Sequence, residues 1–143
     1  MKTYSRAETQ RRGEGKKVMH ENEIGTIIIN TAIGLHKKLG PGLLERVYEV
    51  LLAHKLSEAG LSVKQQVPVP IEFDDITFDE GFRADLVVED KVIIELKSKQ
   101  ELSPSDRKQI QTYLKLSKRK LGYILNFGAA VMKDGIVRAV NNL

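Results

Sequence analysis

Residues 82–97 read Phe-Arg-Ala-Asp-Leu-Val-Val-Glu-Asp-Lys-Val-Ile-Ile-Glu-Leu-Lys. The pattern predicts a β-hairpin with Asp85 on its first strand and with Glu95 and Lys97 on its second. Charged side chains are rare among buried apolar strands unless they have partners. Two neighbouring carboxylates repel each other unless a positive charge lies between them, and a hard divalent cation such as Mg²⁺ prefers oxygen ligands. Lys97, two residues after Glu95, is expected on the same side of the strand.

The length of the hairpin loop decides whether the two acids meet. A three-residue loop at 89–91 pairs Val88 with Val92 and places Asp85 opposite Glu95. A two-residue loop would instead pair Asp85 with Ile94 and turn Glu95 to the other face. Opposed residues share a face, so the first register gathers the apolar side chains on one side. We therefore expect a shared face for Phe82, Ala84, Leu86, Val88, Val92, Ile94 and Leu96.

The composition is that of a globular chain. Its 143 residues are 41% hydrophobic and 29% charged, and they include no Cys. The length indicates a single domain, which we expect over residues 20–143, preceded by a basic mobile arm at 1–19. No apolar run approaches the ~20 residues of a membrane span, and no signal-peptide core precedes the domain. Without Cys, disulfides, thiolate catalysis and Cys-based metal sites are excluded, and a cytoplasmic location is expected.

Charge is distributed unevenly around a net value of +4. Residues 70–90 carry eight acids against one Arg, and residues 103–120 carry six bases against one Asp. A basic helix beside an acidic sheet suits a protein that holds a polyanion near a metal. A solvated helix face would show the same pattern, and for the run 118–120 both interpretations stay open.

Periodicity and breakers predict the order α-α-β-β-β-α-β-β, an α/β domain with a mixed sheet flanked by helices. Pro68 and Pro70 favour an edge position for the first strand, and the second strand has a candidate break near Glu80-Gly81. Ser103, followed by Pro104 and Asp106, marks the start of the third helix. The expected elements span 23–39, 43–59, 63–73, 76–88, 92–97, 104–117, 121–127 and 136–140.

The acids, Lys97 and two later residues together resemble the PD-(D/E)xK nuclease superfamily. The motif consists of Asp85, then Glu95-Leu96-Lys97, then Gln109 and Tyr113 on the next helix. Gly-Leu-Leu-Glu-Arg-Val-Tyr at 42–48 and Leu-Asn-Phe-Gly at 125–128 resemble one branch, the GxxExxY proteins. The resemblance covers about residues 24–140 and implies a restriction-endonuclease-like fold. Phe-Arg-Ala precedes Asp85 where the superfamily name has a Pro.

The resemblance implies metal-dependent hydrolysis of phosphodiester bonds, with DNA as the expected substrate. Asp85, Glu95 and the carbonyl of Leu96 would bind Mg²⁺ or Mn²⁺, which would acidify a water. Lys97 would orient or deprotonate that water, or neutralise developing charge. Glu45 would approach the same centre through water or a second ion.

Residues of the following helix would contact the substrate or support the site. Gln109 could hold Lys97 or a phosphate oxygen, and Tyr113 lies one turn further on the same helical face. The full set of expected nucleic-acid contacts is Tyr113, Arg83, Arg107, Lys108, Lys115, Lys118, Arg119 and Lys120.

Simpler interpretations of these residues remain open. Glu95 and Lys97 could form an ordinary cross-strand ion pair, and Glu45 and Gln109 could be surface residues. Arg83 could be the ion partner of Asp85 or a phosphate contact. Structural roles are expected for Tyr48, Gly42 and His36. Two other functions also stay open: a catalytically silent nucleic-acid-binding module of the same fold, and a small interaction domain that forms a homodimer.

Overall fold

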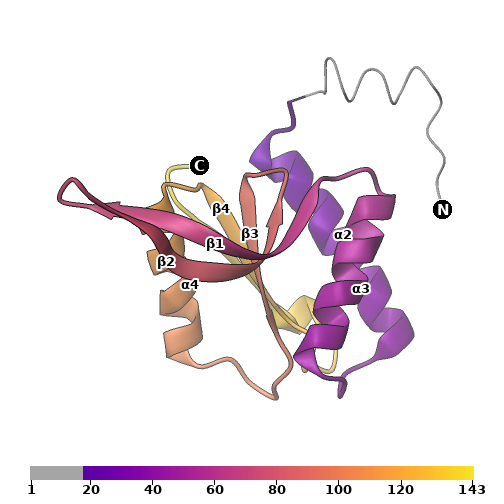
Figure 1. Ribbon diagram of the computed structural model, residues 1–143. Coiled ribbons are helices and arrows are strands. Elements are labelled where there is room, and N and C mark those ends of the chain that lie inside the picture. The colour runs from indigo at the N-terminus through magenta and orange to yellow at the C-terminus, as the bar shows by residue number, and fades with distance from the viewer. Residues whose placement is uncertain (1–17) are drawn as a thin grey trace, which may run out of the picture.

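The computed structural model describes residues 18–143, and its elements follow the predicted order. Two helices come first, then three strands, a helix, a strand, a short 3-10 turn and a last strand (Figure 1). The predicted arm at 1–19 falls almost wholly outside the described residues. The elements are α2 (Glu21–Leu39), α3 (Glu45–Glu58), β1 (Val63–Phe73), β2 (Ile76–Val88), β3 (Val92–Lys97), α4 (Pro104–Ser117), β4 (Leu121–Asn126), η1 (Met132–Gly135) and β5 (Ile136–Val140).

A five-stranded sheet, in the order β1-β2-β3-β4-β5, forms the centre of the domain. β3 and β4 are parallel, and the other neighbouring pairs are antiparallel, so the predicted mixed sheet is confirmed. α2 and α3 pack on one face, where they share a core with β3 and β4, and α4 packs on the other (Figure 1). None of the helices in the described part of the chain has the length and apolar character that a bilayer-spanning segment needs.

The β2–β3 hairpin has the register of the three-residue loop. Val88 pairs with Val92 and Leu86 with Ile94, so the next pair in this register is Asp85 and Glu95. The expected shared apolar face is wrong in part, because Phe82 and Ala84 pack in the α4 core rather than with Leu86. The pairing of β2 with β3 covers only residues 86–88. Beyond it β2 continues as a ribbon with β1 alone, and such two-stranded ribbons twist strongly.

The β1–β2 ribbon extends past the sheet and is irregular where a break was expected (Figure 1). Its register shifts between Val69 and Ile71, whereas β2 itself runs unbroken over Ile76–Val88. The irregularity near Glu80-Gly81 is therefore a register shift rather than the expected break. A Cβ at Gly81 would lie 2.4 Å from the Ile71 side chain, so any larger residue there would have to displace Ile71. β1 is an edge strand, as its prolines predicted.

The third helix begins as predicted. The Ser103 hydroxyl accepts a hydrogen bond from the Asp106 amide at 3.2 Å, and the Asp106 carboxylate accepts one from the Ser103 amide at 2.8 Å. This reciprocal capping satisfies two amides that the helix itself leaves free. It also fixes where the chain leaves β3 and enters α4, directly after the candidate site.

Candidate active site

Asp85 and Glu95 lie together at the end of the β2–β3 pairing. Asp85 Oδ2 accepts a hydrogen bond from the Leu96 amide at 2.8 Å, which anchors its carboxylate beside the third strand. Glu95 is only 9% exposed, and its Oε1 is buried without a hydrogen-bond partner. A buried carboxylate with an unpartnered oxygen is costly, so it indicates a place where something else binds.

The electrostatics of Glu95 follow from this crowding. Burial, and then the neighbouring charge and hydrogen bond of Asp85, raise the pKa of Glu95 to about 9, while Lys97 acts in the opposite direction. Glu95 therefore keeps its proton near neutral pH when no cation is bound. A divalent cation would replace that proton, and carboxylates are the hard oxygen donors that Mg²⁺ and Mn²⁺ prefer. The donor set fits such an ion, although residues 18–143 contain no group of three or more His, Asp or Glu side chains arranged to hold one.

Because its proton is held so tightly, Glu95 should make the metal-free protein less stable as pH rises. The unfolded chain releases this proton near pH 4.5 and the folded chain near 9, so between these values the unfolded state binds fewer protons and stability falls. Urea unfolding at pH 6, 7, 8 and 9 with a chelator present measures the trend. Glu95→Gln should flatten the fall, and Glu101→Gln, an exposed acid, should not. Parallel pH dependence of wild type and Glu95→Gln would contradict this placement of the proton.

Lys97 is the last residue of β3 and lies on the side of Glu95. Its carbonyl accepts a hydrogen bond from the Phe127 amide at 2.8 Å, which fixes the strand end against the chain that follows β4. The charge of its ammonium group acts to lower the pKa of both Glu95 and Glu45. The structure thus brings Asp85, Glu95 and Lys97 together as predicted.

Glu45 reaches the same place from the first turn of α3. Gly40 and Gly42, with φ of 71° and 108°, form the turn before it, a conformation that glycine adopts without strain. The buried Tyr48 hydroxyl donates to the Gly40 carbonyl at 2.6 Å and accepts from the Leu43 amide at 3.1 Å. Partial desolvation and the charge of Asp85 raise the pKa of Glu45. Tyr48 is therefore a core residue, as expected, and it holds the turn that presents Glu45.

Two further polar residues of the site were not predicted. Glu49, one helical turn after Glu45, is 4% exposed and accepts a hydrogen bond from Gln66 Nε2 at 2.8 Å. The same Nε2 lies 3.3 Å from Asp85 Oδ1. Burial and the charge of Asp85 raise the pKa of Glu49. The spacing from Glu45 is the one sequence signal that points to Glu49, since residues four apart share a helix face.

The helix α4 contributes Tyr113 but not Gln109. Tyr113 stacks on Phe82 with ring centroids 3.7 Å apart, and burial together with the charges of Glu95 and Asp85 raises its pKa. It therefore lies beside the acids. Gln109 is exposed, and none of the hydrogen bonds found in residues 18–143 joins it to Lys97. Contact of Gln109 with a phosphate stays a prediction.

The basic residues divide into two groups. Arg83 pairs with Glu80 at 2.9 Å and donates to the Gln66 carbonyl at 3.1 Å, so it is not the ion partner of Asp85. Arg119 is half-buried and donates to the Asp90 carbonyl, which gives it a structural role at the β2–β3 turn. The exposed basic side chains on and just after α4 are those of Arg107, Lys108, Lys115, Lys118 and Lys120.

His36 has the expected structural role. Its Nε2 lies 2.9 Å from the Ala129 carbonyl and 3.2 Å from that of Phe127, and the ring is buried. These contacts tie α2 to the segment after β4.

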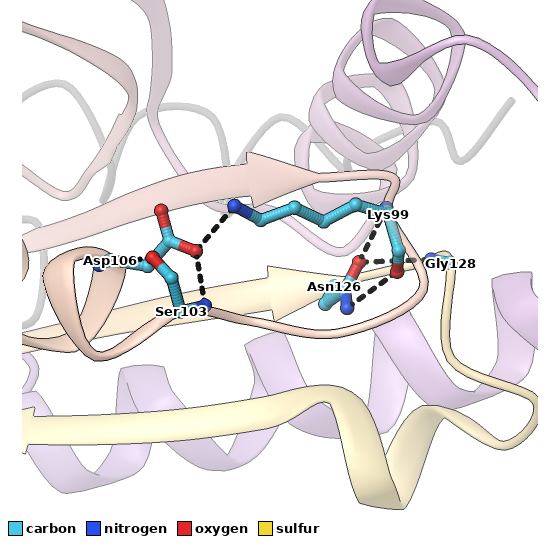
Figure 2. Close-up of polar contacts among 5 residues, drawn as sticks. All are labelled: Lys99, Ser103, Asp106, Asn126 and Gly128. Carbon is cyan, nitrogen blue, oxygen red and sulfur yellow. Dashed lines mark hydrogen bonds and ion pairs between the residues drawn. The ribbon is translucent and has the colours of Figure 1, made fainter.

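The loop between β3 and α4 is pinned by Asn126 (Figure 2). Asn126 Oδ1 accepts from the amides of Lys99 at 3.0 Å and Gly128 at 3.1 Å, and its Nδ2 donates to the Lys99 carbonyl at 2.9 Å. A Cβ at Gly128 would lie 2.2 Å from that carbonyl oxygen, so this close approach requires glycine.

The side chain of Lys99 ties the same loop to the start of α4. Lys99 pairs with Asp106 at 2.5 Å. This pairing and a hydrogen bond from the Ser103 amide lower the pKa of Asp106 to about 2. The Leu-Asn-Phe-Gly segment thus holds the chain that follows Lys97.

A cleft of about 500 Å³ opens beside this loop. Residues 41–45 form one wall, and Ser98, Lys99 and Gln100 contribute to the other. Ser98 joins the walls by donating from its hydroxyl to the Leu43 carbonyl at 2.7 Å. The cleft therefore adjoins Glu45 and the strand end that carries Lys97.

Asn126→Ala should destabilise the fold by about 3 kcal/mol, because it leaves two backbone amides and one carbonyl without their partner. Urea denaturation, analysed with a common slope, measures the loss. Asn126→Asp keeps the acceptor for the two amides but places a buried carboxylate oxygen against the Lys99 carbonyl, so it should be destabilising as well at neutral pH. Equal stability of wild type and Asn126→Ala would show that the loop does not depend on this side chain.

Comparison with known proteins gives one match. A family model described as the PD-(D/E)XK nuclease superfamily matches residues 22–139. Comparisons with curated proteins and with solved structures give no match.

Proposed function

Since the chain belongs to the PD-(D/E)XK nuclease superfamily, we propose that it is a metal-dependent nuclease that hydrolyses phosphodiester bonds in DNA. The observation that carries the proposal is the buried, unpartnered oxygen of Glu95 beside Asp85. Placement in the GxxExxY branch is part of the proposal and is supported by Gly42, Glu45 and Tyr48.

Asp85, Glu95 and the Leu96 carbonyl are the proposed ligands of Mg²⁺ or Mn²⁺, with Glu45 contributing through water or a second ion. When bound, the cation supplies Lewis-acid polarisation of the phosphate and lowers the pKa of a water. Lys97 would orient that water, take its proton or neutralise the charge that develops on the phosphate. Glu95 and Leu96 are buried on β3, so these two proposed ligands need little reorganisation during the reaction.

The basic side chains on and beside α4 are proposed to hold the nucleic-acid backbone, together with Tyr113. Long exposed Lys and Arg side chains attract phosphates without reading sequence, so weak sequence specificity is expected. Gln109 is exposed on the same helix, and a phosphate contact is proposed for it. A cytoplasmic location is proposed, in line with the lack of Cys. A single domain over 20–143 completes the proposal.

An interaction domain that forms a homodimer is the second candidate, and exposed apolar side chains on α3 favour it. Val47 and Val50 are 38% and 40% exposed, and Leu44 before the helix is 78% exposed. The exposed bases of α4 would equally serve a silent nucleic-acid-binding module.

Incubation with labelled linear, circular and branched DNA and RNA, with Mg²⁺ or Mn²⁺, separates the three functions. Cleavage that requires the metal and is lost in Glu95→Gln supports the nuclease. Salt-dependent binding without cleavage would support the silent module. Neither binding nor cleavage, with a concentration-dependent dimer by sedimentation, would support the interaction domain.

A further inference from the structure

Gln66 lies opposite Asp85 in an unusual backbone conformation. Gln65 pairs with Leu86 and Val67 with Ala84, which places Gln66 across from Asp85. Its φ of 52° is in the left-handed region, where a residue other than glycine is strained. Arg83 Nη1 donates to the Gln66 carbonyl at 3.1 Å and holds this conformation. Strained residues that the surroundings hold in place are concentrated at functional sites.

The side chain of Gln66 joins two carboxylates. Its Nε2 donates to Glu49 Oε1 at 2.8 Å and lies 3.3 Å from Asp85 Oδ1. Since the Leu96 amide holds Asp85 Oδ2 at 2.8 Å, both oxygens of Asp85 have a donor. Each carboxylate oxygen carries two lone pairs, so Asp85 keeps free acceptor capacity while its orientation is fixed.

Glu49 has no other evident reason to be buried in α3. It is 4% exposed, its Oε2 has no hydrogen-bond partner, and the nearest cation, Arg46 Nη1, is 3.9 Å away. A buried acid in this position anchors the Gln66 amide, which in turn separates Glu49 from Asp85.

Resting on the proposed function of this site, we propose that Gln66, anchored by Glu49, is a positioning residue that orients Asp85 for the divalent cation. Gln66 would contact Asp85, which is a proposed ligand, and would not contact the cation itself. Loss of such outer partners weakens metal affinity by about 10–100-fold. The strain at Gln66 fits this role, because the left-handed backbone directs the amide toward Asp85.

Titration of the full chain with Mn²⁺ in a calorimeter tests the proposal. Gln66→Ala should raise the dissociation constant about tenfold, and Gln66→Asn, which tolerates the backbone but is one methylene shorter, should do the same. Gln65→Ala removes the exposed neighbouring amide and should stay within about twofold of wild type. Melting temperatures recorded on the same samples separate lost affinity from lost fold, and Gln66→Asn serves if Gln66→Ala does not fold. Wild-type affinity in a folded Gln66 variant would overturn the proposal.

The Glu49 variants distinguish an anchor from a metal ligand. Glu49→Gln still accepts a hydrogen bond from Gln66, so Mn²⁺ affinity should be retained, whereas Glu49→Ala should weaken it as Gln66→Ala does. The double variant of Gln66→Ala and Glu49→Ala should be no worse than either single change. Equal weakening by Glu49→Gln and Glu49→Ala would make Glu49 a ligand and overturn its role as anchor. Absence of Mn²⁺ binding in wild type would remove the proposed function itself, and this inference with it.

Discussion

Lys97→Ala is expected to lower metal-dependent cleavage by about 100-fold or more, while Mn²⁺ affinity changes little. A positioned side chain that moves a proton or stabilises charge in the transition state contributes roughly 10²–10⁴-fold. Lys97 ends β3 beside Glu95, and its carbonyl is held by the Phe127 amide, so truncation of the side chain should leave the backbone in place. Single-turnover rates on the best substrate of the panel measure the effect.

Lys55→Ala is the matched control for this change. Lys55 lies on α3, is half exposed, and pairs with Glu58 at 3.3 Å. It is not one of the residues placed at the site of Asp85 and Glu95. Its removal should leave the rate within about twofold. Equal cleavage by wild type and Lys97→Ala would mean that Lys97 is not catalytic or that a contaminant cleaves the substrate.

Asp85→Asn is expected to have the larger effect, a loss of about 1,000-fold in cleavage. A metal ligand supports several kcal/mol of transition-state stabilisation, and each 1.36 kcal/mol corresponds to a tenfold change in rate. Asn keeps the size of the side chain, so the change removes charge with little change in packing. The rate should recover only slightly at high Mn²⁺ concentration, since Glu95 would be the only carboxylate left of the two proposed ligands on the hairpin.

Asp90→Asn provides the comparison for Asp85→Asn. Asp90 lies in the turn of the same hairpin, its side chain is 73% exposed, and its φ of 55° is one that Asn tolerates. The variant should cleave as wild type does. If both variants lose activity equally, the loss reflects the hairpin fold rather than the site.

The register of the hairpin could be predicted because alternation constrains it. Val88 and Val92 face the core under α2 and α3, and a slip of one residue would turn Glu95 to the face opposite Asp85. That register brings Asp85 toward Glu95, and the Leu96 amide then holds the Asp85 carboxylate beside β3. Ser103 and Asp106 likewise marked the start of α4 through local chemistry, without knowledge of the rest of the fold.

The parts that sequence did not predict depend on geometry that no pattern contains. Phe82 and Ala84 pack in the core under α4, and not in the core under α2 and α3, because the β1–β2 ribbon twists where β3 no longer pairs with it. Glu49 borders an apolar helix stripe and looks like a surface acid, and only the fold places it beside Gln66. The left-handed backbone of Gln66 has no sequence signature, since Gln seldom adopts it.

Calorimetric titration of wild type and Asp85→Asn with Mn²⁺ at pH 8 tests most directly whether Asp85 and Glu95 share a cation. Saturable binding by wild type is expected, with release of a proton because burial and Asp85 raise the pKa of Glu95 to about 9. The heat should vanish in Asp85→Asn and persist in Asp90→Asn. No saturable heat in wild type, or equal binding by wild type and Asp85→Asn, would contradict the shared cation site.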